Sequence, residues 1–172
     1  MCLGIYEDTG SFTFPCTTRE DFASRGYLVA HGANLATIAN LLSKEMDAEQ
    51  ISLLNKLIDS AVHHSINGVD VVTSSVSTES YIPDLAFLVQ KILKIENLNA
   101  IFAIAQMKNK IYVAARSRTP EVDVGVVATE IGGGGHSFAA AATIRNQTLV
   151  ETEQKLLHAL RKHVKSRQRA RD

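Results

Sequence analysis

The 172-residue sequence lacks a long hydrophobic run, has only two cysteines and carries no excess of charge of either sign. No apolar stretch approaches the roughly 20 residues that span a bilayer, and no signal peptide opens the chain, so we expect a cytoplasmic protein with no membrane partner. Cys2 and Cys16 form no disulfide framework and match no zinc-ligand spacing, which fits a reducing compartment. The 18 basic and 18 acidic residues cancel, so net charge does not indicate a nucleic-acid or membrane binder.

What is present is the composition of a globular domain, with 45% apolar and 21% charged residues in a chain long enough to bury a core. Charge is uneven only at the end, where residues 161–172 are RKHVKSRQRARD. This segment is typical of a solvated helix end that continues into a linker, and contact with a polyanion is the alternative.

The first residues predict a strand and not a natural N-terminus. Residues 2–12, CLGIYEDTGSF, begin apolar and reach acidic residues and a glycine turn almost at once. Because a strand that ends at a carboxylate usually lies inside a sheet, we expect that Met1 is not the natural start and that an upstream domain is missing.

The region from about residue 17 to 65 is expected to be helical and to connect two sheet-containing parts. Residues 17–20, TTRE, match a capping box, in which a Thr hydroxyl and a Glu three residues later satisfy the first amides of a helix. Asn34 and Asp47 are candidate caps of two further helices, and apolar residues over 51–62 recur with helical spacing.

From residue 68 onward the pattern changes to alternating strands and helices. Strands are predicted at VDVVTSSVS, AIFAIAQM and IYVAARS, the last two joined by a tight turn at KNK. Helices are predicted from Pro83, over VDVGVVATEI, and after a second capping box that starts at Thr148. The order indicates an α/β fold, in which a helical connector precedes a compact domain with a mixed β-sheet flanked by helices.

Four consecutive glycines, Gly132, Gly133, Gly134 and Gly135, precede His136 and a run of alanines. Glycine reaches positive φ and lets backbone amides approach a ligand, and consecutive amides form a nest that binds anions. A short helix beginning in the alanines would add a partial positive charge, and His136 would donate to a phosphate oxygen. A flexible surface loop is the alternative. A Rossmann dinucleotide site is not indicated, because a helix and not a strand is predicted before the glycines.

Arg116 and Arg118 lie at the end of the strand IYVAARS and just beyond it, shortly before the glycine loop. Alternation along a strand places both guanidiniums on one face, with Ser117 opposite, which suits bidentate recognition of a phosphate. Two solvated surface arginines are the alternative.

The segments GGGGHSFAAAA, ARSR, VDVGVVA and LGIYEDTGSF together resemble the DHH phosphoesterase superfamily. The resemblance is to its oligoribonuclease and 3′-phosphoadenosine-phosphate phosphatase type, also described as exopolyphosphatase-related, and it covers nearly the whole chain. Four further segments, TFPCTTREDF, HGANLATIANLL, DAEQISLLNKLI and SRTPEVDVG, are similar to the version fused to paired CBS domains and an A-adding tRNA nucleotidyltransferase, or poly(A)-polymerase-like, domain.

The resemblance implies a division of the chain. Residues 1–16 would end a DHH catalytic domain, 17–66 would form the helical connector, 67–166 the DHH-associated substrate-binding domain, and 167–172 a basic tail or linker. The intact protein would bind Mn2+ or Mg2+, with Asp8 as the last of its metal ligands.

The Asp-His-His motif that names this superfamily is absent from the chain. His63 and His64 do not replace it, because they lack an adjacent aspartate and fall on the predicted connector helix, where we interpret them as a solvated helix end. We therefore expect no complete catalytic site and no stable metal binding in this chain, since two-metal chemistry needs several fixed ligands around each ion.

The implied function is the substrate-binding portion of a metal-dependent phosphoesterase that hydrolyses short oligonucleotides or nucleotide phosphates. Arg116, Arg118, the four glycines and His136 would hold the phosphate, and the expected partners are short single-stranded RNA or DNA and the missing DHH domain in cis. The alternative is an RNA-end-binding or regulatory module of an A-adding tRNA nucleotidyltransferase or poly(A) polymerase family protein, with a tRNA end as its partner.

Overall fold

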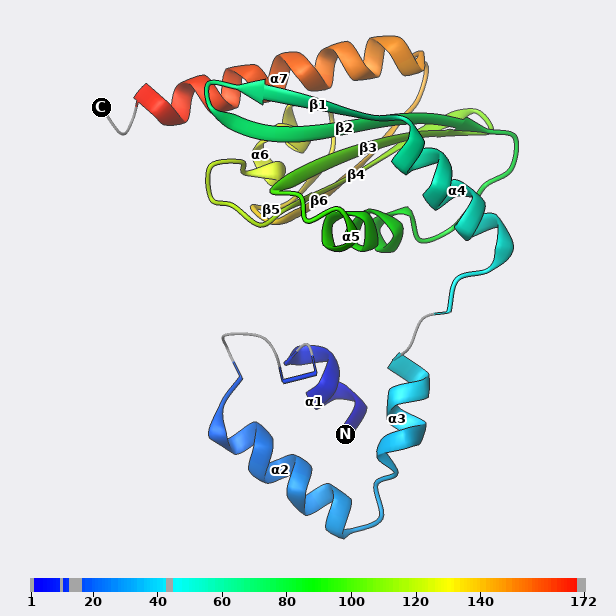
Figure 1. Cartoon of the computed structure of the whole chain (residues 1–172), viewed down its shortest axis with the longest axis vertical. Helices are drawn as coiled ribbons and strands as arrows, with labels where there is room; N and C mark the ends of the chain where they lie inside the picture. The colour runs from blue at the N-terminus through cyan, green and yellow to red at the C-terminus, as the bar shows by residue number, and fades with distance from the viewer. Residues whose placement is uncertain (1, 10, 13–16, 43–44, 170–172) are drawn as a thin grey trace. The chain divides into compact units, whose positions relative to one another are not determined.

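The computed structural model describes residues 2–9, 11–12, 17–42 and 45–169, and it divides the chain into two compact units, Met1–Met46 and Asp47–Asp172 (Figure 1). Cys16, the glycine of the predicted turn at residue 10, and the end of the basic tail at 170–172 lie outside the described residues. The mixed α/β fold class is confirmed. Among the described residues, no helix is both long and apolar enough to cross a membrane.

The first unit contains three helices, and the strand predicted at its start is wrong. Cys2–Asp8 is helix α1, and both the amide and the hydroxyl of Thr9 donate to the carbonyl oxygen of Ile5, at 3.1 Å and 2.5 Å. These bonds to the residue four positions back continue the helical ladder to the end of α1. A short apolar run has no periodicity that separates a helix from a strand, which explains the error.

The other two helices of this unit have the predicted types of N-terminal cap, although the capping residue of the first differs by one position. Helix α2 (Arg19–Ala30) is capped by Thr18 and not Thr17: the Thr18 hydroxyl accepts from the Asp21 amide at 3.3 Å, and the Asp21 carboxylate accepts from the Thr18 amide at 2.8 Å. The hydrogen bonds that the Asp21 carboxylate accepts from the Thr18 amide and from the Thr18 hydroxyl, each at 2.8 Å, lower the pKa of Asp21. Helix α3 (Leu35–Leu42) begins where Asn34 accepts a hydrogen bond from the Thr37 amide.

The second unit opens with helix α4 (Ala48–Asp59), whose predicted cap Asp47 forms a capping box with Gln50. The helix ends at Asp59, so the expectation of a helix to residue 65 is wrong.

Strand β1 (Ala61–Ile66) follows α4 directly, so His63 and His64 lie on a strand and not on a helix end. Asn67 and Gly68 both have positive φ, 51° and 78°, and join β1 to β2 (Val69–Thr78) in the two-residue turn that Asn-Gly favours. The His64 ring also hydrogen-bonds to the Thr73 hydroxyl of β2 at 2.8 Å.

The remaining elements agree closely with those predicted from the sequence, apart from the glycine loop. Helix α5 (Leu85–Ile95), strands β3 (Ala100–Met107) and β4 (Lys110–Ser117), helix α6 (Val124–Glu130), strands β5 (Gly134–His136) and β6 (Ala139–Ile144), and helix α7 (Leu149–Arg169) follow in order. Pro83 precedes α5 and does not open it, because Asp84 is the N-cap and adopts the left-handed conformation at φ 62°.

The strands form one mixed sheet in the order β1-β2-β3-β4-β6-β5. Strands β2 and β3 are parallel, with α5 in their crossover, and the other neighbouring pairs are antiparallel. In Figure 1, α7 lies along one face of this sheet and α5 lies on the other.

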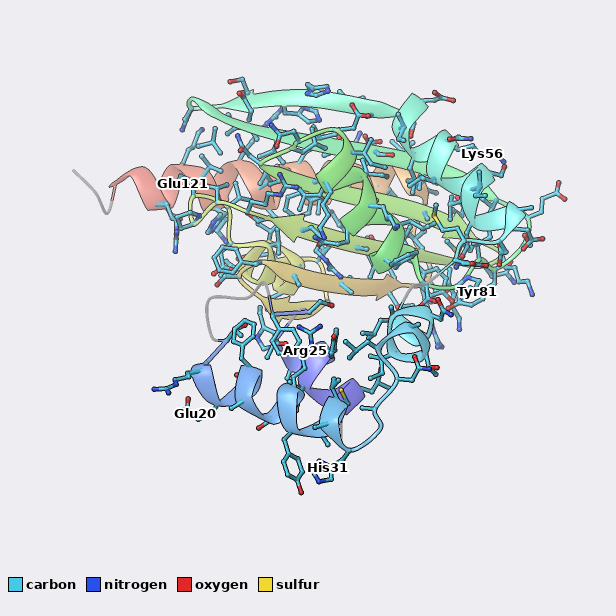
Figure 2. All side chains as sticks on the ribbon, turned by 60° about the horizontal axis from the view of Figure 1, so that its bottom comes forward. Glu20, Arg25, His31, Lys56, Tyr81 and Glu121 are labelled. Carbon is cyan, nitrogen blue, oxygen red and sulfur yellow. The ribbon has the colours of Figure 1, made fainter. Side chains whose placement is uncertain are left out.

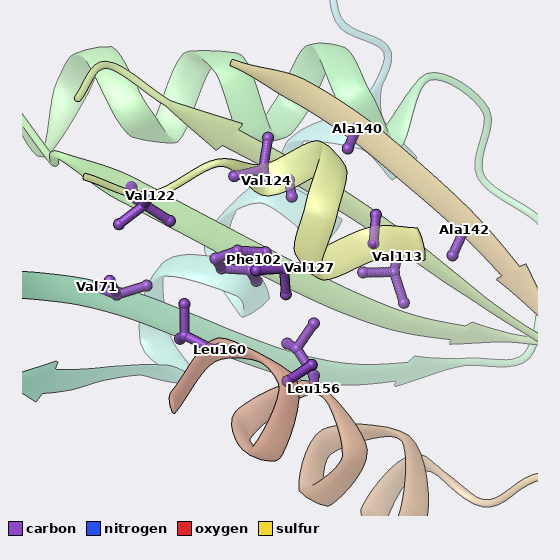
Figure 3. Close-up of a cluster of buried hydrophobic side chains, with 14 of the residues drawn as sticks. Val71, Phe102, Val113, Val122, Val124, Val127, Ala140, Ala142, Leu156 and Leu160 are labelled. Carbon is purple, nitrogen blue, oxygen red and sulfur yellow. The ribbon is translucent and has the colours of Figure 1, made fainter. Parts of the chain in front are cut away.

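The main core lies between the sheet and helices α6 and α7, where alternate residues of the strands meet the apolar sides of the two helices (Figure 3). Phe102, Val127 and Leu160 meet near its centre and are fully buried. The strand residues of this cluster include Phe102, Ile104, Val113, Ala115, Ala140, Ala142 and Ile144. By alternation, the residues between them face the α5 side of the sheet, and that face carries the site.

Candidate phosphate site

The glycine run begins as the C-terminal cap of α6. Gly132 has φ 87°, its amide donates to the Thr129 carbonyl at 3.1 Å, and the Gly133 amide donates to the Ala128 carbonyl at 2.8 Å. This pair of bonds is a Schellman motif with glycine in the left-handed position. The amides of Gly132 and Gly133 are thus engaged by the helix, which does not support the anion-binding role predicted for them.

Close packing against β6 also requires glycine at two positions, at Gly133 just before β5 and at Gly135 within it. A Cβ on Gly133 would overlap the Ala141 carbonyl oxygen and lie 2.5 Å from the Ala142 Cβ. A Cβ on Gly135, which has φ 148°, would lie 2.5 Å from the Ala140 Cα. Gly134 differs from them, because its φ is not positive and nothing lies within 4 Å of the position its Cβ would take.

The alanine run is strand β6, so the short helix considered for it does not form. Residues 139–144 pair with β4 on one side, and residues 139–141 pair with β5 on the other. The partial charge of a helix N-terminus is therefore not available at His136. The small side chains have a different role. They let β5 and α6 pack closely against β6, and they leave the α5 face of the sheet without large strand side chains at Ala139, Ala141 and Gly134.

The register brings two of the predicted phosphate ligands, Arg116 and His136, to one face. Arg116 pairs with Ala139, and Ala139 pairs with His136, so the three residues form a row across β4, β6 and β5. Directly opposed residues of an antiparallel ladder project to the same side, and strands lie about 4.8 Å apart. Arg116 and His136 are therefore two strands apart on the same face, with only a methyl group between them.

Arg116 has the electrostatics of an anion ligand. Its side chain is half-buried, and its Nη1 donates to the Ala115 carbonyl at 2.9 Å. Burial lowers the pKa of the guanidinium, because desolvation disfavours its charged form. In the part of the chain that the structure describes, no carboxylate lies within ion-pair distance of Arg116. A desolvated cation of this kind is stabilised by a bound anion.

Arg118 lies beyond the end of β4 and is exposed. Its Nη1 donates to the Asn97 side chain at 3.1 Å, and its amide donates to the Asn99 carbonyl at 2.8 Å. Ser117 between the arginines is buried, and its hydroxyl hydrogen-bonds within the turn to Thr119. The guanidinium of Arg118 is thus directed by Asn97, and its part in phosphate binding stays a prediction.

The β5–β6 turn that follows His136 is held at three points. The Ser137 carbonyl accepts from the Val124 amide, and the Phe138 carbonyl accepts from the Ser117 amide, each at 3.1 Å. The Ser137 hydroxyl donates to the Asp123 carboxylate at 2.6 Å, and the same carboxylate caps α6. Burial raises the pKa of Asp123, but the hydrogen bonds from Ser137 and the helix amides outweigh it and lower the pKa overall.

His163 of α7 contacts Asp123, the residue that binds Ser137 of this turn, and sequence reasoning missed all three residues. The His163 ring is buried, and its Nε2 accepts from the Asp123 amide at 3.0 Å. Burial, and then the positive charge of Arg167, lower the pKa of His163. A histidine on the apolar side of a helix gives no sequence signal for such a contact.

The pKa of His163 predicts a loss of stability on acidification. A histidine that is neutral in the folded state binds a proton more readily once unfolded, where its pKa is about 6.5. Stability should therefore be complete above that pH and fall as the pH drops through it. In thermal melts between about pH 7.5 and about pH 5.5, we expect His163→Gln to flatten the decline and the exposed control His158→Gln to leave it unchanged. Part of the decline in melting temperature with falling pH will remain in His163→Gln, because burial also lowers the pKa of His64. An unaltered slope in His163→Gln would contradict this assignment.

Asp8 is the last residue of α1 and is exposed. Among the described residues, no group of three or more His, Cys, Asp or Glu side chains is placed to hold a metal ion. The donor set in the described residues therefore does not fit a divalent metal site, and we assign no step to one. The predicted role of Asp8 as a metal ligand stays a prediction.

Comparison with known proteins places these features in a family. The family model of the DHHA1 domain matches residues 68–166, which include Arg116, the glycines and His136. The A-adding tRNA nucleotidyltransferase of Geobacter sulfurreducens is 46% identical over 88% of this chain and 17% of its own length. The bifunctional oligoribonuclease and PAP phosphatase NrnA of Thermus thermophilus is 26% identical over 95% of this chain and 50% of its own length.

A solved structure shares the fold. An exopolyphosphatase-related protein from Bacteroides fragilis superposes with a TM-score of 0.74 and 21% identity, over 93% of this chain and 48% of that one. The chain thus spans half or less of the length of each of these proteins.

Proposed function

Because the chain belongs to the DHHA1 domain family, whose model covers residues 68–166, we propose that it is the substrate-binding portion of a metal-dependent DHH-type phosphoesterase. The observation that carries the proposal is the row of Arg116, Ala139 and His136 on one sheet face, in which the guanidinium is half-buried and faces no described carboxylate. This arrangement binds a terminal phosphate and orients the nucleotide attached to it.

The remaining steps belong to the longer protein. We assign to this chain the binding and orientation of substrate. The DHH part of the longer protein would hold the divalent ion, Mn2+ or Mg2+, and the ion would supply the activation of water. The proposed substrates are short oligonucleotides or nucleotide phosphates, as the name of the Thermus thermophilus relative suggests. The proposed boundaries keep 1–16 as the end of the DHH domain and 67–166 within the substrate-binding domain, but the helical connector ends before residue 61, because β1 belongs to the sheet of that domain.

A second function is favoured by one specific observation, the 46% identity to an A-adding tRNA nucleotidyltransferase. In that case the same row would hold the phosphate of an RNA end and position it for another domain. One measurement, made on a longer protein that contains this segment, distinguishes the two functions. Manganese-dependent release of mononucleotides from a short oligoribonucleotide supports the phosphoesterase, and tight binding of a tRNA end without hydrolysis supports the positioning module.

The phosphate site itself is tested on this chain by calorimetric titration with a nucleoside 5′-monophosphate and with the corresponding nucleoside. We expect only the phosphorylated form to bind. Arg116→Ala should weaken it roughly 10- to 150-fold, the loss of one charge-assisted hydrogen bond. The control is Arg161→Ala, an exposed arginine on α7, which packs on the opposite face of the sheet. Equal binding of nucleoside and nucleotide, or an unaffected Arg116→Ala, would remove the site from this face.

A further inference from the structure

A cavity lies on the same sheet face as the phosphate row of Arg116, Ala139 and His136, at the other end of the strands. It has a volume of about 170 Å³ and lies between the start of α5 and strands β4 and β6. Its walls include Ile82, Leu85, Tyr81, Tyr112 and Thr143. A cavity of about 150 Å³ is enough to bind a benzene ring, so the space accepts one aromatic ring.

The two tyrosines make one wall of this cavity aromatic. Their ring centroids are 5.3 Å apart and their planes are inclined by 57°. Tyr81 is 49% exposed, although tyrosine is a large and partly apolar residue. Rings of this kind present a π-face on which a nucleobase stacks, and their hydroxyl groups supply hydrogen bonds at its edge.

The backbone on the C-terminal side of Tyr81 is fixed, so the ring is positioned before any ligand arrives. The adjoining Ile82 is 5% exposed, and its amide donates to the Met107 sulfur at 3.4 Å. The Pro83 carbonyl accepts from the Gln50 side chain at 3.2 Å. An exposed aromatic residue next to an anchored segment loses little conformational entropy on binding.

A floor of small side chains connects the cavity to the phosphate row. Along β4, Tyr112, Ala114 and Arg116 face the same side, and on β6 their partners are Thr143, Ala141 and Ala139. Ala114 is buried, because α5 packs against β4, whereas Ala141 is exposed, so the open path between the tyrosine and the arginine runs along β6. Figure 2 shows Tyr81 at one end of the second unit and Glu121, which follows the arginines, at the other.

The separation of the two ends sets the size of the ligand. Four residues along an antiparallel strand span about 14 Å. A base and its own phosphate are joined through a single ribose, whereas a base and the phosphate of the neighbouring nucleotide are joined through two. We propose that the cavity at Tyr81 and Tyr112 is a nucleobase subsite for the second residue of a dinucleotide whose terminal phosphate is held by Arg116 and His136. This inference rests on the function proposed above.

The test is calorimetric titration of the chain, in EDTA so that no ligand is hydrolysed, with a 5′-phosphorylated dinucleotide and with the mononucleotide. The dinucleotide should bind more tightly. Tyr81→Ala should weaken only the dinucleotide, by about 5- to 150-fold, which is the scale of one base–aromatic stack. Tyr81→Trp should restore it.

The matched control is Tyr27→Ala, which removes an exposed tyrosine that stacks on His31 in the first unit, and it should change neither affinity. Equal affinities for the two ligands, or an equal loss of both in Tyr81→Ala, would overturn the subsite. Failure of the phosphate site itself gives a different result, because the mononucleotide would then bind without dependence on Arg116.

Discussion

Gly133→Ala is expected to destabilise the second unit by about 3 kcal/mol or more, near the upper end of what a single small substitution does. The added methyl group would overlap the Ala141 carbonyl oxygen and lie 2.5 Å from the Ala142 Cβ. Neither neighbour can yield easily, because Ala141 and Ala142 belong to β6, which is held by β4. Relief of the overlap would require β5 and the end of α6 to move away from β6.

Thermal melts of three variants separate this packing requirement from the general cost of replacing a glycine. Gly132→Ala should lose about 1 kcal/mol, because it places a side chain at the left-handed cap of α6 but meets no neighbour. Gly134→Ala should be nearly neutral, since its position is open and its φ is not positive. A melting temperature of Gly133→Ala close to that of Gly134→Ala would show that β5 does not pack on β6 as described.

The sequence predicts most of the elements of the second unit because their signals are local. The caps at Asp47 and Thr148, the apolar run from Ala100 to Met107 and the turn after it each define an element within a few residues. The elements misassigned at α1 and β1 have an ambiguous local signal, and β5 and β6, in the glycine and alanine runs, were not predicted either. Helix α1 is a short apolar run, and β1 continues the apolar pattern of α4 until the Asn67–Gly68 turn, a hairpin signal that our sequence analysis overlooked.

The candidate site was also only partly predictable from the sequence. Arg116, His136 and the glycines are recognisable as residue types, and the strand register then places Arg116 and His136 on one face. The reason for the glycines was only partly predicted, because Gly132 caps a helix while Gly133 and Gly135 make room for β6. The contacts of Asp123, Ser137 and His163 connect residues up to 40 positions apart, and no local pattern reports such a distance.

Gly134→Val is expected to remove phosphate binding while leaving the fold intact. On sequence alone this change should also lower the melting temperature, because a positive φ was expected at Gly134. The structure removes that expectation: its φ is not positive, its Cβ would meet nothing within 4 Å, and valine is favoured in a strand.

The lost affinity follows from where the new side chain would stand. Gly134 and His136 are two residues apart on β5 and therefore face the same side, above the open floor at Ala141. A valine there occupies the space beside the imidazole, so a phosphate held by Arg116 can no longer approach His136. We expect a loss of roughly 10- to 150-fold or more in the affinity for a nucleoside monophosphate, the contribution of at least one charge-assisted hydrogen bond.

The measurement pairs calorimetric titration with thermal melting, and Gly26→Val is the control. Gly26 lies in α2 of the first unit, and a Cβ there also meets nothing within 4 Å, so the same substitution is made far along the chain from the site. The control should bind normally. If Gly134→Val binds as well as the parent chain and melts at the same temperature, the phosphate does not lie against β5, and the open position at Gly134 has no part in the site.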